Sequence, residues 1–279
     1  MVAVVFGARG SVGRHVAAGL RAAGEHVRVT SRNPATAGFA PGTHVVAADL
    51  ERPETLPAAL EGVEKAFLYA KPDGIESFVA AARSAGVRHV VLLSSGAVVA
   101  EDAERNPIAQ HHRAVEVAIE QSDLAWTFIR PGMFATNTRW WWATPIRTEG
   151  VVRVPYPDAQ TAPIHEKDMA ALAVTALTEP GHQQRAYTVA GPESLTLRQQ
   201  VEHIGAALGR TIALEVISAE AARADLAWTM PPIGVETVLR LWAAADGKPA
   251  KVSEVVREVT GRPAHTFAEW ARDRADDFR

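Results

Sequence analysis

The sequence contains no cysteine among its 279 residues. Disulfide bonds, thiolate nucleophiles and thiolate metal sites are therefore excluded. The chain also has little excess of one charge over the other, because 29 Lys and Arg against 32 Asp and Glu leave a net charge of −3. This balance gives no argument for binding to nucleic acid or to an anionic membrane. We see no signal peptide and no apolar run long enough to span a bilayer, so we expect a cytoplasmic protein.

Two kinds of catalytic site are missing as well. The Gly-x-Ser-x-Gly pattern of a hydrolase elbow is absent, and no group of His, Asp and Glu residues has metal-binding spacing, so we expect no metal. The rest of the composition, with 47% hydrophobic and 22% charged residues, is ordinary for a globular enzyme. A chain of this length can bury a large core, either as one α/β domain or as a domain with a satellite lobe.

The most informative feature present is a glycine-rich turn at the start of the chain. Gly7, Gly10 and Gly13 follow the apolar residues 2–6 and precede a helical pattern. In such a turn one glycine permits the tight bend, one lets backbone amides approach a pyrophosphate, and one lets the helix pack on the strand. The N-terminus of the helix then offers N–H groups to the phosphates. The spacing G-x-x-G-x-x-G differs from the usual G-x-G-x-x-G, yet its place between strand and helix predicts a dinucleotide site.

Strands and helices alternate through the first half of the chain. Apolar runs predict strands, and residues at helical spacing predict helices between them. The expected strands are 2–6, 27–31, 44–48, 65–69, 87–93 and 126–129, and the expected helices include 53–60, a segment from residue 75 to Gly86, and 107–120. Such alternation predicts an α/β fold of the Rossmann type, a doubly wound parallel sheet covered on both faces.

The pattern changes after Pro131. Short expected strands at 151–154, 186–189 and 212–217 alternate with helices that begin at Thr196, Ser218 and Thr266. We therefore predict an NAD(P)-binding domain over residues 1–131 and a smaller α/β substrate lobe over 132–279 that is partly woven into the first.

The end of the second strand indicates which cofactor binds. An NAD-binding fold has an acidic residue there for the ribose 2′-hydroxyl, whereas this chain has Ser31 and Arg32. Arg32 can pair with a 2′-phosphate, and Arg9 is placed to reach the same group, which favours NADPH over NADH. Asp49 and Leu50 are expected beside the adenine. The alternatives are that Arg32 is a solvated surface residue and that Asp49 only caps a loop.

Three consecutive tryptophans, Trp140 to Trp142, are unusual. Neighbouring residues of a helix point about 100° apart, so the three rings cannot all face one core. With Met133, Phe134, Met230 and the tryptophans at 228 and 242, they are expected to form an aromatic pocket for a flat apolar substrate. Ordinary core packing is the alternative.

The chain resembles a known family through a set of motifs. They are Gly7-Ala-Arg-Gly10-x-x-Gly13, Ser31-Arg32-Asn-Pro, Asp49-Leu50, Leu93-Ser94-Ser95-Gly96, His112-Arg-Ala-Val-Glu116, Ile129-Arg130-Pro131-Gly132-x-Phe134-x-x-Asn137, 164–170 and Tyr187-x-x-x-Gly191-Pro192-Glu193. Together they are similar to the NmrA-like branch of the atypical short-chain dehydrogenase/reductases, over most of the chain to about residue 210. The branch contains NAD(P)H-dependent quinone reductases, isoflavone-type reductases and non-catalytic redox-sensing regulators. The resemblance specifies the fold and the cofactor site better than the substrate.

The chain departs from the wider superfamily at the catalytic pair. Other members carry Tyr-x-x-x-Lys, but here His112 takes the place of the lysine and Ile108 that of the tyrosine. Ser95 matches the superfamily's serine. Because histidine titrates near neutral pH, we predict His112 and Ser95 as catalytic residues. The alternative is that His111 and His112 lie inert on an exposed helix start.

The complete set of expected contacts follows. For the cofactor, NADPH in preference to NADH, they are Gly7, Arg9, Gly10, Ser11, Val12, Gly13, Ser31, Arg32, Asp49, Leu50, Ala70, Lys71, Ser94, Pro131 and Gly132. For the substrate they are Met133, Phe134, Asn137, Trp141, His165 and Trp228. His165 lies in a turn before a helix, and capping that helix is its alternative role.

The function expected from these residues is an NADPH-dependent reductase of a quinone, an enone or a polycyclic aromatic carbonyl compound. A quinone needs little help from an acid, which suits a site without the tyrosine. A non-catalytic NADP(H) sensor that binds a partner protein, and an isomerase or cyclase that reuses the pocket, remain alternatives. The expected partner is a small flat molecule rather than nucleic acid or membrane, and a homodimer stays open.

Overall fold

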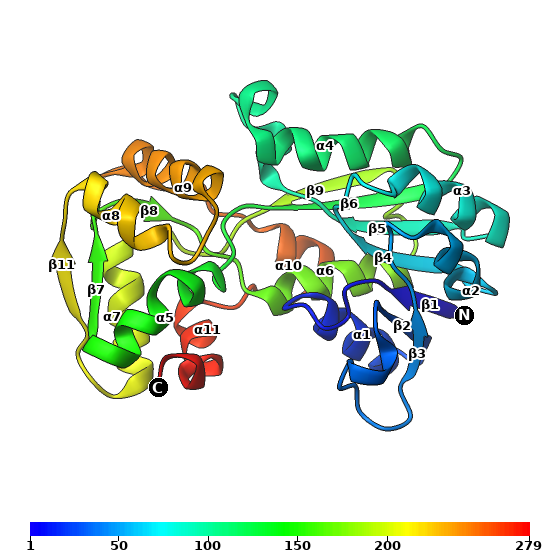
Figure 1. Cartoon of the computed structure of the whole chain (residues 1–279), viewed down its shortest axis with the longest axis horizontal. Helices are drawn as coiled ribbons and strands as arrows, with labels where there is room; N and C mark the ends of the chain where they lie inside the picture. The colour runs from blue at the N-terminus through cyan, green and yellow to red at the C-terminus, as the bar shows by residue number, and fades with distance from the viewer. The chain divides into compact units, whose positions relative to one another are not determined.

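The computed structural model describes all residues, 1–279, and the chain forms two compact units (Figure 1). Unit 1 comprises Met1–Gly132, Glu166–Val189 and Val255–Arg262, and unit 2 comprises Met133–His165, Ala190–Glu254 and Pro263–Arg279. Residues 166–189 and 255–262, which were predicted to belong to the second lobe, therefore lie with the first unit.

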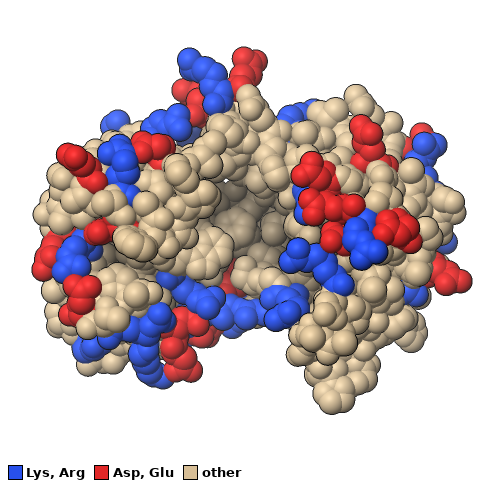
Figure 2. Space-filling view, viewed as in Figure 1, with Lys and Arg blue, Asp and Glu red and all other residues tan.

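Charged side chains of both signs are interspersed over the face shown in Figure 2. No helix combines the length and the apolar character that crossing a bilayer requires.

Unit 1 is built on one parallel sheet. Its strands are β1 (Val2–Val5), β2 (His26–Ser31), β3 (His44–Ala47), β4 (Lys65–Tyr69), β5 (His89–Leu93), β6 (Ala125–Pro131) and β9 (Arg185–Val189). They lie in the order β3-β2-β1-β4-β5-β6-β9, and every neighbouring pair is parallel. The predicted Rossmann-like doubly wound sheet is confirmed. Strand β9 explains why residues beyond 165 return to this unit, because it pairs with β6 at the edge of the sheet.

Helices cover both faces of this sheet. Helix α1 packs against α6 and α6 against α10, while α3 packs against α2 and α4. Their bounds are α1 (Gly13–Ala22), α2 (Leu56–Leu60), α3 (Ile75–Ala85), α4 (Pro107–Glu120), α6 (Glu166–Thr178) and α10 (Val255–Thr260). The central strands are apolar on both faces because both faces are buried. On the α2–α3–α4 side, Phe6 meets Phe78 edge to face with ring centroids 5.5 Å apart.

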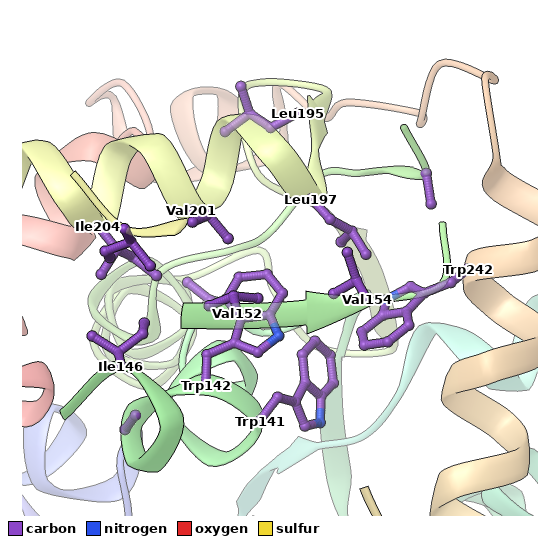
Figure 3. Close-up of a cluster of buried hydrophobic side chains, with 14 of the residues drawn as sticks. Trp141, Trp142, Ile146, Val152, Val154, Leu195, Leu197, Val201, Ile204 and Trp242 are labelled. Carbon is purple, nitrogen blue, oxygen red and sulfur yellow. The ribbon is translucent and has the colours of Figure 1, made fainter. Parts of the chain in front are cut away.

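Unit 2 has two small sheets packed with helices. Strands β7 (Val151–Val154) and β11 (Ala213–Val216) pair in parallel, and β8 (Gln160–Thr161) and β10 (Leu195–Thr196) pair antiparallel. The helices are α5 (Asn137–Glu149), α7 (Leu197–Leu208), α8 (Ala219–Leu226), α9 (Pro232–Ala245) and α11 (Phe267–Asp273). Figure 3 shows part of the core of this unit, in which Trp141, Trp142 and Trp242 gather beside β7.

Local sequence signals set most of these boundaries. The three helices predicted to begin at Thr196, Ser218 and Thr266 do so. Thr196 forms a capping box with Gln199, Thr266 forms one with Glu269, and Ser218 accepts a hydrogen bond from the N–H of Ala221. The segment 53–60, predicted as one helix, is instead a 3₁₀ turn followed by α2. The structure has five 3₁₀ turns, at Pro34–Thr36, Pro53–Thr55, Gly96–Val99, Ala103–Arg105 and Ala275–Phe278.

A buried histidine makes the stability of unit 1 depend on pH. His89 of β5 is almost fully buried, and its Nε2 lies 2.9 Å from the hydroxyl of Thr127. Because that hydroxyl donates to the carbonyl of His182, it accepts from His89, which places the ring proton on Nε2. Burial, with smaller contributions from Lys65 and His182, lowers the pKa of His89 from 6.5 to about 4.

We therefore expect the free energy of unfolding to fall as the pH is lowered from about 6.5 to about 4. In that window the unfolded chain binds a proton that the folded chain does not, which is worth about 3 kcal/mol. Denaturant unfolding at several pH values, compared between the wild type and His89→Gln, measures the effect. The glutamine variant should lose most of this slope, and an equal slope in both proteins would rule out His89 as its source.

Candidate dinucleotide and substrate sites

A cavity of about 660 Å³ opens at the carboxyl ends of four strands of unit 1. Its lining comes from the ends of β1, β2, β3 and β4, and comprises Phe6, Gly7, Arg9, Gly10, Thr30, Ser31, Arg32, Asn33, Thr36, Ala48, Asp49, Leu50, Tyr69 and Lys71. Strand order reverses here, since β2 and β3 lie on one side of β1 and β4 on the other. This reversal is where an open α/β sheet binds its ligand.

The glycine turn forms one wall of this cavity and has the geometry that a phosphate needs. Gly7 has φ +68°, and its carbonyl accepts a hydrogen bond from the N–H of Gly10 at 2.8 Å. A Cβ on Gly13 would lie 2.3 Å from the oxygen of Gly7, so this residue has no room for a side chain. A Cβ on Gly10 would meet only that oxygen, at 3.1 Å, so the surface at Gly10 is otherwise open.

Helix α1 begins directly after this turn without a capping side chain and without an acidic residue in its first turn. The N–H groups of Arg14 and His15 already donate to the carbonyls of Gly10 and Val12. No side chain of this turn neutralises the partial positive charge of the helix start, which therefore favours an external anion. The turn and the helix start together fit a bound pyrophosphate.

The charges around the cavity favour an anion. Three cationic side chains line it, Arg9, Arg32 and Lys71, against the single acidic residue Asp49. The Lys71 ammonium pairs with Glu51 at 2.9 Å, so the two arginines are the cations left for a phosphate. Ser31 accepts a hydrogen bond from the N–H of Asn33, which shapes the corner around Arg32.

Asp49 lines the cavity and also makes hydrogen bonds within its own loop. Its Oδ1 accepts a hydrogen bond from the N–H of Glu51, and Thr55 bonds to its backbone. Both roles considered for Asp49, loop capping and a contact at the adenine end, are therefore compatible with its position.

Sequence reasoning missed Tyr69 as a member of this cavity. The ring lies against the glycine turn, with its Cδ1 2.9 Å from the position of a Cβ on Gly7. Tyr69 is the last residue of β4, so its place at the carboxyl edge of the sheet was the signal that could have identified it. The other lining residues that were not predicted are Phe6, Thr30, Asn33, Thr36 and Ala48.

Several predicted cofactor contacts do not line this cavity. They are Ser11, Val12, Gly13, Ala70, Ser94, Pro131 and Gly132, and their contacts with the cofactor stay predictions. Val12 and Gly13 are buried at the start of α1. The hydroxyl of Ser94 is also buried, and it donates to Glu116 rather than facing the cavity.

The predicted catalytic residues have local partners. Ser95 Oγ accepts from the N–H of Ala97 and caps the 3₁₀ turn after β5. Nδ1 of His112 lies 2.7 Å from the carbonyl oxygen of Ile108 on the same helix. Because a carbonyl only accepts, the proton of the neutral ring is on Nδ1 and Nε2 keeps its lone pair. His111 instead lies with its Nε2 3.3 Å from the carbonyl of Ala70, next to the end of β4.

A buried ion-pair network lies beneath these residues. Glu116 of α4 is completely buried, and Arg130 of β6 donates to both of its oxygens at 2.8 Å. Ser94 adds a hydrogen bond at 2.7 Å, and Arg113 contacts the carboxylate at 3.1 Å. One carboxylate thus links α4 to the carboxyl ends of β5 and β6, and it holds the turn that carries Ser95.

We expect Glu116→Ala to lower the free energy of unfolding by about 3–5 kcal/mol, because it leaves the partly buried Arg130 without its partner. Glu120→Gln is the matched control, since Glu120 pairs with Arg113 at the more exposed end of α4 and should cost under about 1 kcal/mol. Denaturant unfolding measures both. Equal small losses would show that the network contributes little to the fold.

Unit 2 has a cavity of its own, of about 380 Å³. The predicted substrate residues Trp141 and Trp228 line it, together with Trp142 and Trp242.

The other predicted substrate residues do not line this cavity. Met133 packs on the core of unit 2, Phe134 forms a β-bridge with Ile164, and Asn137 begins α5. His165 is buried with its Nε2 3.2 Å from Asp273. Their roles toward a substrate stay predictions.

Comparison with known proteins agrees with this geometry. Residues 7–180 match the model of a family described as NAD(P)H-binding. The chain is 41% identical to a (4-alkanoyl-5-oxo-2,5-dihydrofuran-3-yl)methyl phosphate reductase of Streptomyces griseus, with 99% of this chain and 98% of the relative covered. It is 36% identical to an NAD(P)H azoreductase of Xenophilus azovorans, with the same shares covered. The crystal structure of an NADPH-dependent quinone oxidoreductase of Escherichia coli complexed with NADPH has a TM-score of 0.79 at 26% identity, covering 98% of this chain and 99% of that one.

Proposed function

The chain belongs to the NAD(P)H-binding family, in the NmrA-like branch of the atypical short-chain dehydrogenase/reductases, and we propose that it is an NADPH-dependent reductase of a quinone, an enone or a polycyclic aromatic carbonyl compound. The observation that carries the proposal is the cavity at the reversal of strand order, where the open backbone at Gly10 lies beside Arg9 and Arg32. The three similar proteins described above support the class of reaction, because each of the three is named as a reductase or an oxidoreductase.

Different residues of the cavity bind different parts of the cofactor. The turn from Gly7 to Gly13 and the start of α1 hold the pyrophosphate through backbone N–H groups. Arg32, with Arg9 and Ser31, holds the 2′-phosphate that distinguishes NADPH from NADH. NADPH, when bound, supplies the hydride, and the protein contributes orientation and a dry environment.

Reduction also needs a proton, and the chain lacks the tyrosine that supplies it in related enzymes. Ile108, at the start of α4, stands in its place. His112 has a fixed neutral tautomer, and burial lowers the pKa of its ring. It is therefore mostly uncharged at neutral pH and becomes a better proton donor as the pH falls. A quinone accepts a hydride with little acid assistance, so such a substrate suits this site best.

Consumption of NADPH in the presence of a naphthoquinone, an enone and a polycyclic aromatic ketone tests the proposal. We expect turnover with at least the quinone, and faster turnover with NADPH than with NADH at equal concentrations. A protein that binds NADPH and oxidises it with none of these compounds would contradict the proposal.

The role of Arg32 gives a separate prediction. Arg32→Ala should weaken NADPH binding by about 1.5–3 kcal/mol, roughly 10- to 150-fold, because a charge-assisted contact with the 2′-phosphate is lost. NADH lacks that phosphate, so its affinity should barely change. Arg52→Ala is the control, since Arg52 is exposed near the same edge, pairs with Glu54 and lies outside the cavity lining. Calorimetry that shows equal losses for both cofactors would refute the assignment.

A further inference from the structure

One lysine of the unit 1 cavity is held by an ion pair. Lys71 lines the cavity with its side chain 25% exposed, and its Nζ lies 2.9 Å from Oε2 of Glu51. Glu51 is 49% exposed and does not itself line the cavity. The hydrogen bond to Glu51 raises the pKa of the Lys71 ammonium, and the charge of Asp49 acts in the same direction. A carboxylate from outside the lining therefore neutralises one cation of the cavity.

Strand order places Lys71 beside the glycine turn. Because β1 lies between β2 and β4, the turn after β1 has the corner with Arg32 on one side and the segment with Lys71 on the other (Figure 1). Tyr69, at the end of β4, contacts the turn, since its Cδ1 lies 2.9 Å from the position of a Cβ on Gly7. A pyrophosphate held by the turn would therefore lie closer to Lys71 than a 2′-phosphate held by Arg32.

The two loops that carry the ion pair are packed against each other through their backbones. Gly74 has φ +87°, and a Cβ there would lie 1.8 Å from the carbonyl oxygen of Leu50. Within the loop after β3, the N–H of Glu51 donates to Oδ1 of Asp49 at 3.1 Å. Separating the loops would break this packing, so the pair opens most readily by rotation of its side chains. The flexible stem of a lysine allows its ammonium to reach a second acceptor in this way.

A phosphate competes well with Glu51 for this ammonium. The pair is partly exposed, so water and salt screen it and it contributes little to stability. A pyrophosphate carries more negative charge than a single carboxylate and offers more acceptor oxygens. The carboxylate also repels phosphates that bind nearby. Binding of a dinucleotide therefore favours transfer of the ammonium from Glu51 to phosphate.

We propose that Glu51 is an internal competitor of the cofactor for Lys71. When NADPH binds, the Lys71 ammonium leaves the Glu51 carboxylate and pairs with the pyrophosphate, and when NADP⁺ leaves, Glu51 takes the ammonium back. Glu51 thereby weakens dinucleotide binding and speeds release of the oxidised cofactor. The proposal rests on the proposed function only for the identity of the dinucleotide.

Calorimetry on the full chain, with NADPH and with NADH, tests the exchange. Glu51→Gln keeps the size of the side chain but removes its charge, so it should bind both cofactors about 2- to 5-fold tighter, the equivalent of one exposed ion pair. Lys71→Gln should bind both about 10-fold more weakly, because a charge-assisted contact with phosphate is lost. Both cofactors contain the pyrophosphate, so the effects should be equal for the two, unlike those of Arg32→Ala.

Two further variants serve as controls. Glu54→Gln removes the same charge from a nearby residue, but Glu54 pairs with Arg52 and neither residue lines the cavity. It should bind both cofactors as the wild type does. The double variant Glu51→Gln/Lys71→Gln should bind like Lys71→Gln alone, because no ammonium is left for Glu51 to withhold.

Stopped-flow measurement of NADP⁺ dissociation gives a second readout. Release should be about 2- to 5-fold slower from Glu51→Gln than from the wild type, since changes in affinity at one site act mostly on the dissociation rate. Unchanged or weaker cofactor binding in Glu51→Gln would overturn the proposal, as would an equal gain in Glu54→Gln or a gain that persists without Lys71.

The exchange and the reductase fail separately in these experiments. Binding of both cofactors without any effect of Glu51→Gln removes the exchange and leaves the reductase. Tighter binding to Glu51→Gln, in a protein whose wild type consumes no NADPH with any of the carbonyl compounds, keeps the exchange and removes the reductase. A folded wild type that binds neither cofactor would overturn both.

Discussion

Gly10→Val is expected to abolish NADPH binding while unit 1 stays folded. The residue lies in the cavity lining, and the only atom that a new Cβ would crowd is the oxygen of Gly7 at 3.1 Å. The valine methyl groups would occupy the space through which a pyrophosphate approaches the backbone. If two charge-assisted hydrogen bonds between the pyrophosphate and the backbone are lost, binding weakens by about 3–6 kcal/mol, which lowers the affinity for NADPH on the order of 10²-fold or more.

Calorimetry with NADPH, together with thermal unfolding of the same variant, separates binding from folding. Gly234→Val is a suitable control, because that glycine lies in α9 of unit 2 and a Cβ there would touch only Met230, at 3.4 Å or more. It should bind NADPH within a few-fold of the wild type. A folded Gly10→Val protein with near wild-type affinity would show that the phosphates bind elsewhere.

His112→Ala is expected to lower the turnover of a carbonyl substrate about 10²–10⁴-fold, the range that a positioned acid contributes. The hydrogen bond from Nδ1 to the carbonyl of Ile108 holds the ring, and burial lowers its pKa. The charged ring is therefore the minor form at neutral pH, and wild-type turnover of the carbonyl substrate should rise as the pH is lowered from 6.5 toward the pKa in the folded protein. For a quinone both effects should be smaller.

Steady-state kinetics of matched variants check this assignment. Tyr69→Phe, Tyr156→Phe and Tyr187→Phe should each stay within a few-fold of the wild type. His111→Ala separates the two neighbouring histidines, since His111 contacts the carbonyl of Ala70 rather than that of Ile108. Collapse of turnover in one of the tyrosine variants, with His112→Ala unaffected, would transfer the role of the acid to that tyrosine.

The parts of the fold that follow local rules could be predicted from the sequence. Helix α4 runs from Pro107 to Glu120 as predicted, because Asn106 caps its first turn and Pro107 suits its first position. Strand β4 also matches its predicted bounds of 65–69. The segment after Pro53 was predicted as one helix, but its first three residues form a 3₁₀ turn. Three residues are too few for the spacing of apolar side chains to distinguish a 3₁₀ turn from the first turn of an α-helix.

Features that depend on tertiary contacts were beyond the sequence. Strand β9 was expected, but nothing in its residues shows that it pairs with β6 and joins unit 1. The same is true of Glu116, whose neighbours in sequence give no sign that Arg130 and Ser94 meet its carboxylate. Tyr69 belongs to the cavity because β4 ends beside the glycine turn, and this neighbour relation follows from strand order alone.

The most direct test of the reductase is to follow the hydride itself. NADPH that carries deuterium at the transferable position of its nicotinamide is mixed with the protein and naphthoquinone, and cofactor and quinone are measured together. We expect one NADPH to be consumed for each quinone reduced, and the deuterated cofactor to react more slowly when hydride transfer limits the rate. Gly10→Val should neither oxidise NADPH nor reduce the quinone. Quinone reduction at the rate seen without protein, while the wild type binds NADPH, would contradict these expectations.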